Sequence, residues 1–322
     1  MSQRVVYFNG RFVPESEARV SIYDSALVMG DMAFEVTRTV GQKPFRLDDH
    51  LKRLAHTLSA LRIETGFTTE RWQEITAETL TRNLPTEAEN VDWNIIHNVS
   101  RGPSGAFAEA FAPDELRPTV IISCYPLIDK LAALALCYQE GIDLVVPAQR
   151  SLPGDLLDDK LKTRSRLHYQ LANFQAAEIR AGAWAALVDP AGHLTEGTSG
   201  NLFLVRDGEL LTPKAKNLLP GITRHLVIEL AEKIKQPWRE ADLTTADAAT
   251  ADEVFVTSTS IGILHARSFD GATVRDGKIG PISSRMRAGL AEFMGVDFAA
   301  QAAEYARLRA DRLAVPNPSQ NP

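Results

Sequence analysis

Cysteine is scarce in this sequence, since Cys124 and Cys137 are the two examples among 322 residues. Both lie in apolar segments, which favours small buried side chains over a disulfide or a reactive thiol. The sequence also lacks a CxxC pattern and any cluster of Cys and His residues. We therefore expect no structural zinc and no other metal site.

Long apolar runs are missing as well, since none approaches the roughly 20 residues that a helix needs to cross a bilayer. The first residues, MSQRVVYFNG, lack the charged start and apolar core of a secretion signal, so we expect a cytoplasmic protein. A basic excess is absent too, because 35 Lys and Arg face 41 Asp and Glu, for a net charge of −6. Without spare cations to neutralise a phosphate backbone, nucleic acid is not an expected partner, and neither is a membrane.

What remains is the composition of a soluble globular protein, with 44% hydrophobic and 24% charged residues. A chain of this length can hold two domains, each with its own core. The segment VVYFNGRFVP predicts a hairpin around Asn9-Gly10, and a second hairpin is expected around Gly41-Gln42. Two helices and two strands are then expected, over residues 47–63, 71–83, 93–101 and 119–125.

The second half of the chain also mixes strands and helices. We expect a strand at 142–150, a helix at 165–182, three strands within 183–213, a helix from 220 to about 235, a strand at 252–260 and a final helix over roughly 283–293. The tail is rich in Pro, Asn and Ser, which predicts disorder. The pattern indicates an α+β chain with an N-terminal domain at 1–125, a connector at 126–137, a C-terminal domain at 138–312 and a tail at 313–322.

Three features suit an anion such as phosphate, although each also has an ordinary structural interpretation. In LPGITRHLVIELAEKI, Pro220 and Gly221 begin a helix whose free N–H groups and positive dipole end could bind a phosphate. The cluster Thr257–Ser260 ends a strand and could supply hydroxyl donors, or could simply form a turn. Arg53 lies off the leucine stripe of its helix, where it is either a ligand or a solvated surface cation.

Two further residues suggest covalent chemistry. Glu196 in LTEGTSGNLFLV ends a strand within a run of small residues, which suits a carboxylate bonded to a cationic ring nitrogen. Lys162 in DKLKTRSRLHY lies between a strand and a helix, where a lysine is usually a surface residue. Desolvated beside Arg164 and Arg166, it could instead be a nucleophile with a lowered pKa. Lys160 is the rival nucleophile.

Taken together and in this order, these motifs resemble the class IV aminotransferases, the fold-type IV pyridoxal-phosphate (PLP) enzymes. The similar motifs are HLKRL, KTRSRLHY, LTEGTSGNLFLV, LPGITR and VTSTS, and the resemblance extends from about Tyr7 to Gly280. It implies a two-domain fold with a smaller N-terminal α/β domain and a larger C-terminal domain built on a barrel-like mixed sheet. It also implies a homodimer that binds an amino donor and a 2-oxo acid acceptor.

The resemblance assigns a role to each matching residue. Lys162 would form a Schiff base with pyridoxal 5'-phosphate and then carry a proton between substrate and cofactor. Glu196 would keep the pyridine nitrogen protonated, and Leu219 would pack on one face of the ring. The phosphate would be held by Arg53, by the backbone N–H groups of Ile222 and Thr223, and by Thr259.

The substrate is less clear, because the usual residues that bind the substrate carboxylate are missing. Branched-chain enzymes of the family usually carry tyrosines where this chain has Met29 and Leu167, and a pocket arginine at or near Ile96. The Arg-x-His pair of D-amino acid enzymes and the basic residue of the lyase are also absent after the SRG turn. Replacement anchors, or structural ion-pairing residues, are Arg38, Arg101, Arg164 and Arg166.

Phe34, Val36 and Arg38 alternate along one strand, so all three could face the substrate together with Ser260. The missing anchor also fits a substrate without an α-carboxylate, as in an (R)-amine transaminase. A branched-chain-like amino acid aminotransferase is the first hypothesis. The others are an elimination of the aminodeoxychorismate lyase type, a D-amino acid transaminase and a non-catalytic phosphate- or PLP-binding protein.

Overall fold

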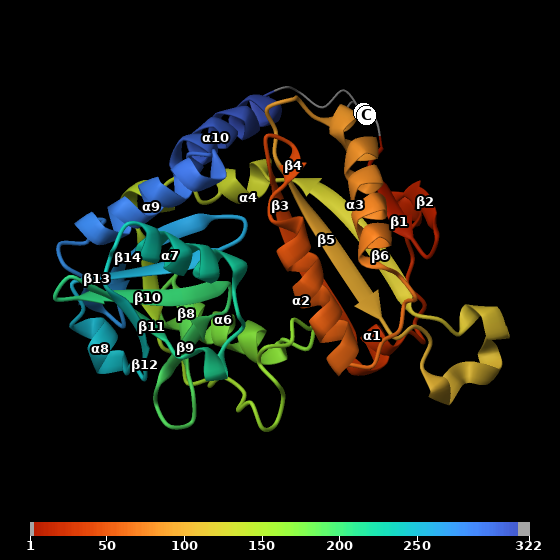
Figure 1. Cartoon of the computed structure of the whole chain (residues 1–322), viewed down its shortest axis with the longest axis horizontal. Helices are drawn as coiled ribbons and strands as arrows, with labels where there is room; N and C mark the ends of the chain where they lie inside the picture. Colours follow the sequence, from red (N-terminus) through yellow and green to blue (C-terminus); the bar gives the residue numbers. More distant parts are fainter. Residues whose placement is uncertain (1–2, 315–322) are drawn as a thin grey trace, which may run out of the picture.

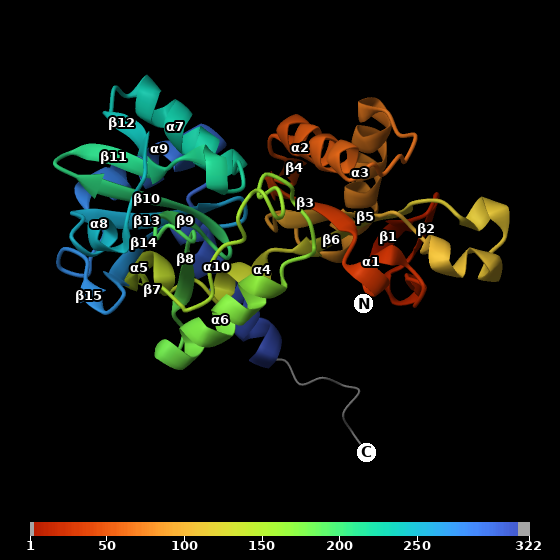
Figure 2. The ribbon, with the colours of Figure 1, turned by 90° about the horizontal axis from the view of Figure 1, so that it is seen from below.

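The computed structural model describes residues 3–314, apart from the side chain of Asn217. Figure 1 shows an N-terminal sheet with two helices beside a C-terminal barrel, and Figure 2 shows the same separation from below. Helix α10 (Phe298–Ala314) and helix α4 (Ile128–Ala132) run along the junction and pack against each other. The α+β class expected from the sequence is confirmed, because the fold matches class IV aminotransferase structures.

The N-terminal sheet has six strands in the order β2-β1-β6-β5-β3-β4, and all its pairs are antiparallel. Asn9 and Gly10 have positive φ angles, as the expected Asn-Gly hairpin turn requires. Helices α2 (Leu47–Ala60) and α3 (Thr69–Asn83) bury their apolar stripes on one face of the sheet. The strands are β1 (Val5–Phe8), β2 (Arg11–Pro14), β3 (Met32–Val40), β4 (Lys43–Pro44), β5 (Trp93–Ser100) and β6 (Thr119–Pro126).

The C-terminal sheet closes into a mixed barrel. Its strands follow the order β10-β13-β14-β7-β8-β9, and β9 pairs back onto β10; the β14–β7 and β7–β8 pairs are parallel. Strands β11 and β12 continue the sheet beyond β10, and β15 pairs with β14. The bounds are β7 (Ile142–Val145), β8 (Trp184–Val188), β9 (Leu194–Gly197), β10 (Gly200–Arg206), β11 (Glu209–Pro213), β12 (Trp238–Ala241), β13 (Glu253–Ser258), β14 (Gly262–Phe269) and β15 (Ala272–Thr273).

The remaining helices surround the barrel or join elements. They are α1 (Ser25–Met29), α5 (Cys137–Glu140), α6 (Leu167–Ile179), α7 (Ile222–Lys233), α8 (Thr245–Ala249) and α9 (Pro281–Met294), with 3-10 turns η1 (Glu15–Glu17), η2 (Leu84–Thr86), η3 (Gly105–Ala110), η4 (Pro113–Glu115) and η5 (Ala215–Asn217). Within residues 3–314, no helix is both long and apolar enough to cross a membrane. Both cysteines are free thiols.

Two expectations about the second half are wrong. The segment 183–213 forms four strands rather than three, because LTEGTSGN folds back as a hairpin in which Glu196 lies opposite Asn201. Helix α10 was not expected, and it continues through residues 313–314 of the expected tail. Residues 315–322, the rest of that tail, lie outside the described part of the chain.

Candidate active site

A cavity of about 220 Å³ lies between the N-terminal sheet and the barrel. It draws side chains from both halves of the chain, from strand β3 and helix α2 on one side and from β9, β13 and the start of α7 on the other. Its lining includes Phe34, Val36, Arg53, Lys130, Lys162, Arg166, Tyr169, Glu196, Leu219, Ile222, Thr223 and the segment 257–260.

The backbone around Lys162 is fixed by the N-terminal domain. The Phe34 N–H donates to the carbonyl oxygen of Lys162 at 2.9 Å, and the Arg164 N–H donates to Met32 O at 2.8 Å. The Lys162 N–H donates in turn to Thr57 Oγ1 on α2, at 3.2 Å. This short stretch therefore runs beside the start of β3 and presents the lysine side chain to the cavity.

The surroundings of Lys162 favour the uncharged form of its amine. Its Nζ lies 4.8 Å from the centre of the Phe34 ring, and the charge of Arg53 is close by. Burial, followed by Arg53, lowers the pKa of Lys162 to about 7. A substantial share of this amine is therefore neutral and nucleophilic near neutral pH. Lys160, the rival, is exposed and is not part of the cavity lining.

Glu196 is held on β9 by two donors. Tyr169 Oη donates to Glu196 Oε1, and Asn201 Nδ2 donates to Glu196 Oε2 at 3.1 Å. Burial raises the pKa of Glu196, and the hydrogen bond from Tyr169 counteracts this rise. These two donors therefore fix the orientation of the carboxylate at the cavity wall. A cationic donor from a ligand would offset the cost of burying its negative charge.

The start of helix α7 leaves backbone N–H groups that are suited to an anion. Gly221 is the N-cap residue and supplies no side-chain cap for the N–H groups of the first turn. A Cβ atom at Gly221 would lie 2.0 Å from Asn201 Oδ1, so only glycine allows this close approach. Asn201 Nδ2 also donates to Leu219 O at 3.0 Å and fixes the segment that leads into the helix.

A second close approach occurs between the paired strands β10 and β13. A Cβ atom at Gly200 would lie 2.2 Å from the carbonyl oxygen of Thr257. The hydroxyl of Thr257 is buried and has no hydrogen-bond partner among the described residues. Because Thr257 lines the cavity, this unpaired hydroxyl is available to a polar ligand.

Arg53 is a fixed cation beside the α7 helix start. Its Nε and Nη2 donate to the two oxygens of Glu35 at 2.8 and 2.7 Å, and its Nη1 donates to Pro220 O at 2.9 Å. Burial opposes ionisation of Glu35, but Arg53 and His50 together hold the pKa of this carboxyl well below its usual value. Glu35 thus positions Arg53 for an anion.

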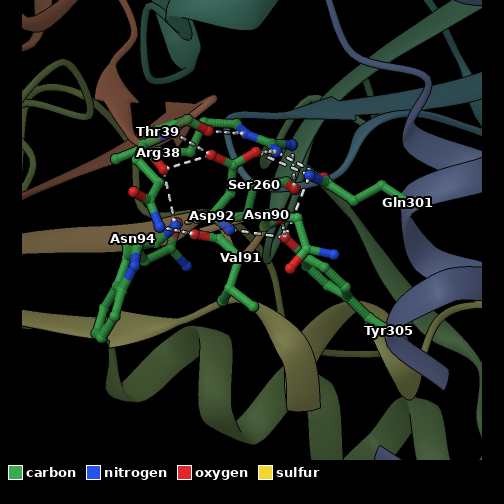
Figure 3. A network of polar contacts seen from close by, with 11 residues as sticks. Arg38, Thr39, Asn90, Val91, Asp92, Asn94, Ser260, Gln301 and Tyr305 are labelled. Atoms are coloured by element: carbon green, nitrogen blue, oxygen red, sulfur yellow. Dashed lines mark hydrogen bonds and ion pairs between the residues drawn. The ribbon is translucent and has the colours of Figure 1, made fainter. Parts of the chain in front are cut away.

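The structure brings most of the candidate residues together. The residues that line the one cavity are Phe34, Val36, Arg53, Lys162, Glu196, Leu219, Ile222, Thr223, Thr259 and Ser260. Arg101 and Arg164 are not part of the lining, and neither is Arg38. The side chain of Arg38 is fully buried, and its guanidinium donates to the carbonyl oxygens of Thr39 and Ser260 and to Gln301 Oε1 (Figure 3). Its assignment to the substrate is therefore corrected to a structural role.

Sequence reasoning did not identify Glu35, Tyr169, Asn201 or Lys130. The Gly-Thr-Ser-Gly turn could have placed Asn201 opposite Glu196, because a two-residue hairpin turn fixes the register. Tyr169 lies one turn into helix α6, and Lys130 is a single lysine in the connector. Tyr169 ends the KTRSRLHY motif, but nothing in the sequence pairs it with Glu196, and no spacing links Lys130 to the site.

Comparisons with known proteins agree with this geometry. The family model for amino-transferase class IV matches residues 32–269. The chain is 29% identical over 287 residues to the branched-chain-amino-acid aminotransferase of Escherichia coli strain K12, covering 88% of this chain and 90% of the relative. It is 27% identical over 297 residues to the D-alanine aminotransferase of Staphylococcus haemolyticus, covering 90% and 97%.

A solved structure gives the same result. It is a T.th. branched-chain amino acid aminotransferase complexed with N-(5'-phosphopyridoxyl)-L-glutamate, which superposes with a TM-score of 0.79 at 26% identity. The match covers 92% of this chain and 95% of that one.

Proposed function

Because this chain belongs to the class IV aminotransferase family, we propose that it transfers an amino group between an amino acid and a 2-oxo acid, with Lys162 as its covalent cofactor anchor. The enzyme uses pyridoxal 5'-phosphate, whose ring, when bound, withdraws electrons from the substrate carbon. The observation that carries the proposal is the meeting of Lys162, Glu196 and the α7 helix start in one cavity.

The residues present fit this cofactor. The uncapped first turn of α7, together with Arg53 and the hydroxyl of Thr259, offers the donors that a phosphate group requires. Glu196 offers a buried carboxylate for a protonated ring nitrogen. Leu219 lines the same cavity and offers an apolar side chain for one face of the ring.

Lys162 performs two tasks in this scheme. Its neutral amine would hold the cofactor covalently, which a protonated lysine could not do. When not engaged in that bond, the same amine would hold and return the proton of the substrate α-carbon. Phe34 packs beside the Nζ atom and restricts the directions in which it can move.

An amino acid of the branched-chain type is the substrate we favour. The cavity offers apolar contacts from Phe34, Val36 and Leu219, and the E. coli relative is a branched-chain-amino-acid aminotransferase. The similarity to a D-alanine aminotransferase supports a second candidate, a D-amino acid donor, because it extends over 90% of this chain.

A donor screen tests the proposal. Purified enzyme should absorb in the visible range, and the band should bleach within seconds to minutes when L-leucine or L-valine is added. Adding 2-oxoglutarate or pyruvate should restore it. Bleaching by D-alanine or by an (R)-amine alone would identify the other substrate classes. Colourless enzyme, or release of many equivalents of 2-oxo acid per enzyme without any acceptor, would contradict transamination.

A homodimer is the second part of the proposal. Helix α6 carries an exposed apolar stripe at helical spacing, with Leu167 71%, Leu171 41% and Phe174 58% exposed. Helix α1 exposes Leu27 and Met29 as well. Exposed apolar surface of this extent is typical of a protein interface.

The substitution Phe174→Glu should shift the protein toward a monomer, because it places a charge in the apolar stripe. Light scattering after size exclusion would measure the mass at several concentrations. Leu313→Glu is the matched control, since Leu313 is 77% exposed on α10 and away from α6. A wild-type monomer, or an unchanged dimer after Phe174→Glu, would count against this interface.

A further inference from the structure

The structure leaves most of the arginines proposed as carboxylate anchors unsuited to that role. Arg101 is held by Asp31 Oδ2 at 2.8 Å and by the carbonyl oxygens of Leu61 and Arg62. Arg164 donates twice to Asn98 Oδ1, at 3.0 and 2.8 Å. Neither residue lines the cavity, and Arg38 is excluded by its own buried network.

Arg166 does line the cavity, but its guanidinium already contacts other groups of the protein. Its Nε donates to Thr163 O at 3.0 Å, and the group lies over the rings of Phe34 and Tyr169. Its charge acts on Glu196 and opposes the rise of the Glu196 pKa. Arg166 therefore belongs to the Glu196 end of the cavity.

Lys130 is the remaining cation. Among the described lining residues the cations are Arg53, Lys130, Lys162 and Arg166, and Glu196 is the sole acid. Arg53 is paired with Glu35, and Lys162 is the proposed cofactor anchor. In the described part of the chain, no hydrogen bond or ion pair satisfies the ammonium group of Lys130.

Helix α4 holds Lys130 in place. Ile128 and Leu131 are buried in the barrel core, and the Leu127 N–H donates to Asp92 O at 2.8 Å. The neighbouring acid, Asp129, forms an ion pair with Arg309 of α10 at 3.2 Å and does not pair with Lys130. The Lys130 side chain is exposed to solvent, so an anion can reach it. The surrounding protein, followed by the charge of Arg38, lowers the pKa of Lys130, so an incoming anion would stabilise its charged form.

We propose that Lys130 binds the carboxylate of the amino acid and 2-oxo acid substrates. This proposal rests on the proposed transamination. It makes Lys130 the residue that selects substrates with a carboxylate over amines that lack a carboxylate. The charge of Arg38 acts on Lys130, and Arg38 donates to Ser260 O, so the carboxylate would lie near Ser260. The phosphate would lie at the start of α7, beside Arg53, so each anion would contact a different cation. Lys130 is a specificity residue rather than part of the covalent chemistry.

The test compares Lys130→Met, which keeps the length of the side chain, with Lys130→Arg, which keeps the charge. Isothermal titration of the holoenzyme with 4-methylvalerate, a carboxylate without an amino group, measures the contact without turnover. We expect Lys130→Met to raise the dissociation constant about 10- to 100-fold and Lys130→Arg to restore most of the affinity. Lys233→Met, on an exposed turn of α7, is the matched control and should have no effect.

Kinetics give a second readout. KM for the amino acid should rise in Lys130→Met by a similar factor, while kcat and the visible band change less than about twofold. Equal dissociation constants for wild type and Lys130→Met would overturn the proposal, and so would the absence of any 4-methylvalerate binding to the wild type. A colourless wild type that still binds 4-methylvalerate through Lys130 would instead contradict the proposed function alone.

Discussion

Lys162→Ala should lower transamination by at least about 10⁴-fold, because it removes both the covalent anchor and the proton carrier. The purified variant should also lose the visible band of the bound enzyme. Burial and the charge of Arg53 lower the pKa of Lys162 to about 7, so its amine is available as a nucleophile near neutral pH. An ordinary lysine is almost fully protonated at neutral pH and has no free electron pair.

Lys160→Ala is the matched control for this result. Lys160 lies two residues earlier and is exposed, and its backbone N–H donates to Asp158 Oδ1. We expect activity within about twofold of the wild type, as for most exposed substitutions away from a site. Borohydride reduction followed by peptide mass spectrometry should place the cofactor on Lys162. Cofactor found on Lys160, or retained covalently in Lys162→Ala, would contradict the assignment.

The sequence could predict those parts of the site that depend on local structure. Glu196 and the α7 helix start were found because a turn and a helix start are encoded by neighbouring residues. The position of Arg53 off the leucine stripe left a surface cation equally open, and the resemblance to the family singled it out; the structure places it beside Pro220, 167 residues away. Each of these residues faces the cavity because its own element turns it that way.

Contacts between distant elements could not be predicted in the same manner. The alternation along β3 correctly places Phe34 and Val36 in the cavity. It fails at Arg38, because the strand continues past the cavity into the junction between sheet and barrel. There Arg38 meets Ser260 and Gln301, which lie 222 and 263 residues further along the chain. Lys130 escaped notice for the same reason, since only the packing of α4 turns it to the site.

The Arg38 network joins the two halves of the molecule (Figure 3). From the N-terminal half come Arg38, Thr39 and Asp92, and from the C-terminal half Ser260 and Gln301. The guanidinium also lies 4.9 Å from the ring centre of Phe298 on α10. Because Arg38 donates to the carbonyl oxygen of Ser260, it also supports the turn that lines the cavity.

Arg38→Met should therefore lower the free energy of unfolding by about 3–5 kcal/mol, since it leaves the buried charge of Asp92 without its cation. Urea denaturation followed by circular dichroism would measure the loss. The exposed pair of Arg71 and Glu74 provides the control, because Arg71→Met removes an arginine of equal size and should cost less than about 0.5 kcal/mol.

A double substitution separates the charge from the packing. Asp92→Asn removes the carboxylate that Arg38 compensates, so Arg38→Met with Asp92→Asn should be more stable than the sum of the two single losses predicts. The coupling should reach about 1–3 kcal/mol, because both groups are buried and 3.4 Å apart. Additive losses would mean that Asp92 is satisfied by Thr39, Gln42 and Gln301 alone. In that case the arginine holds the two halves together through Ser260, Gln301 and Phe298, and not through its charge.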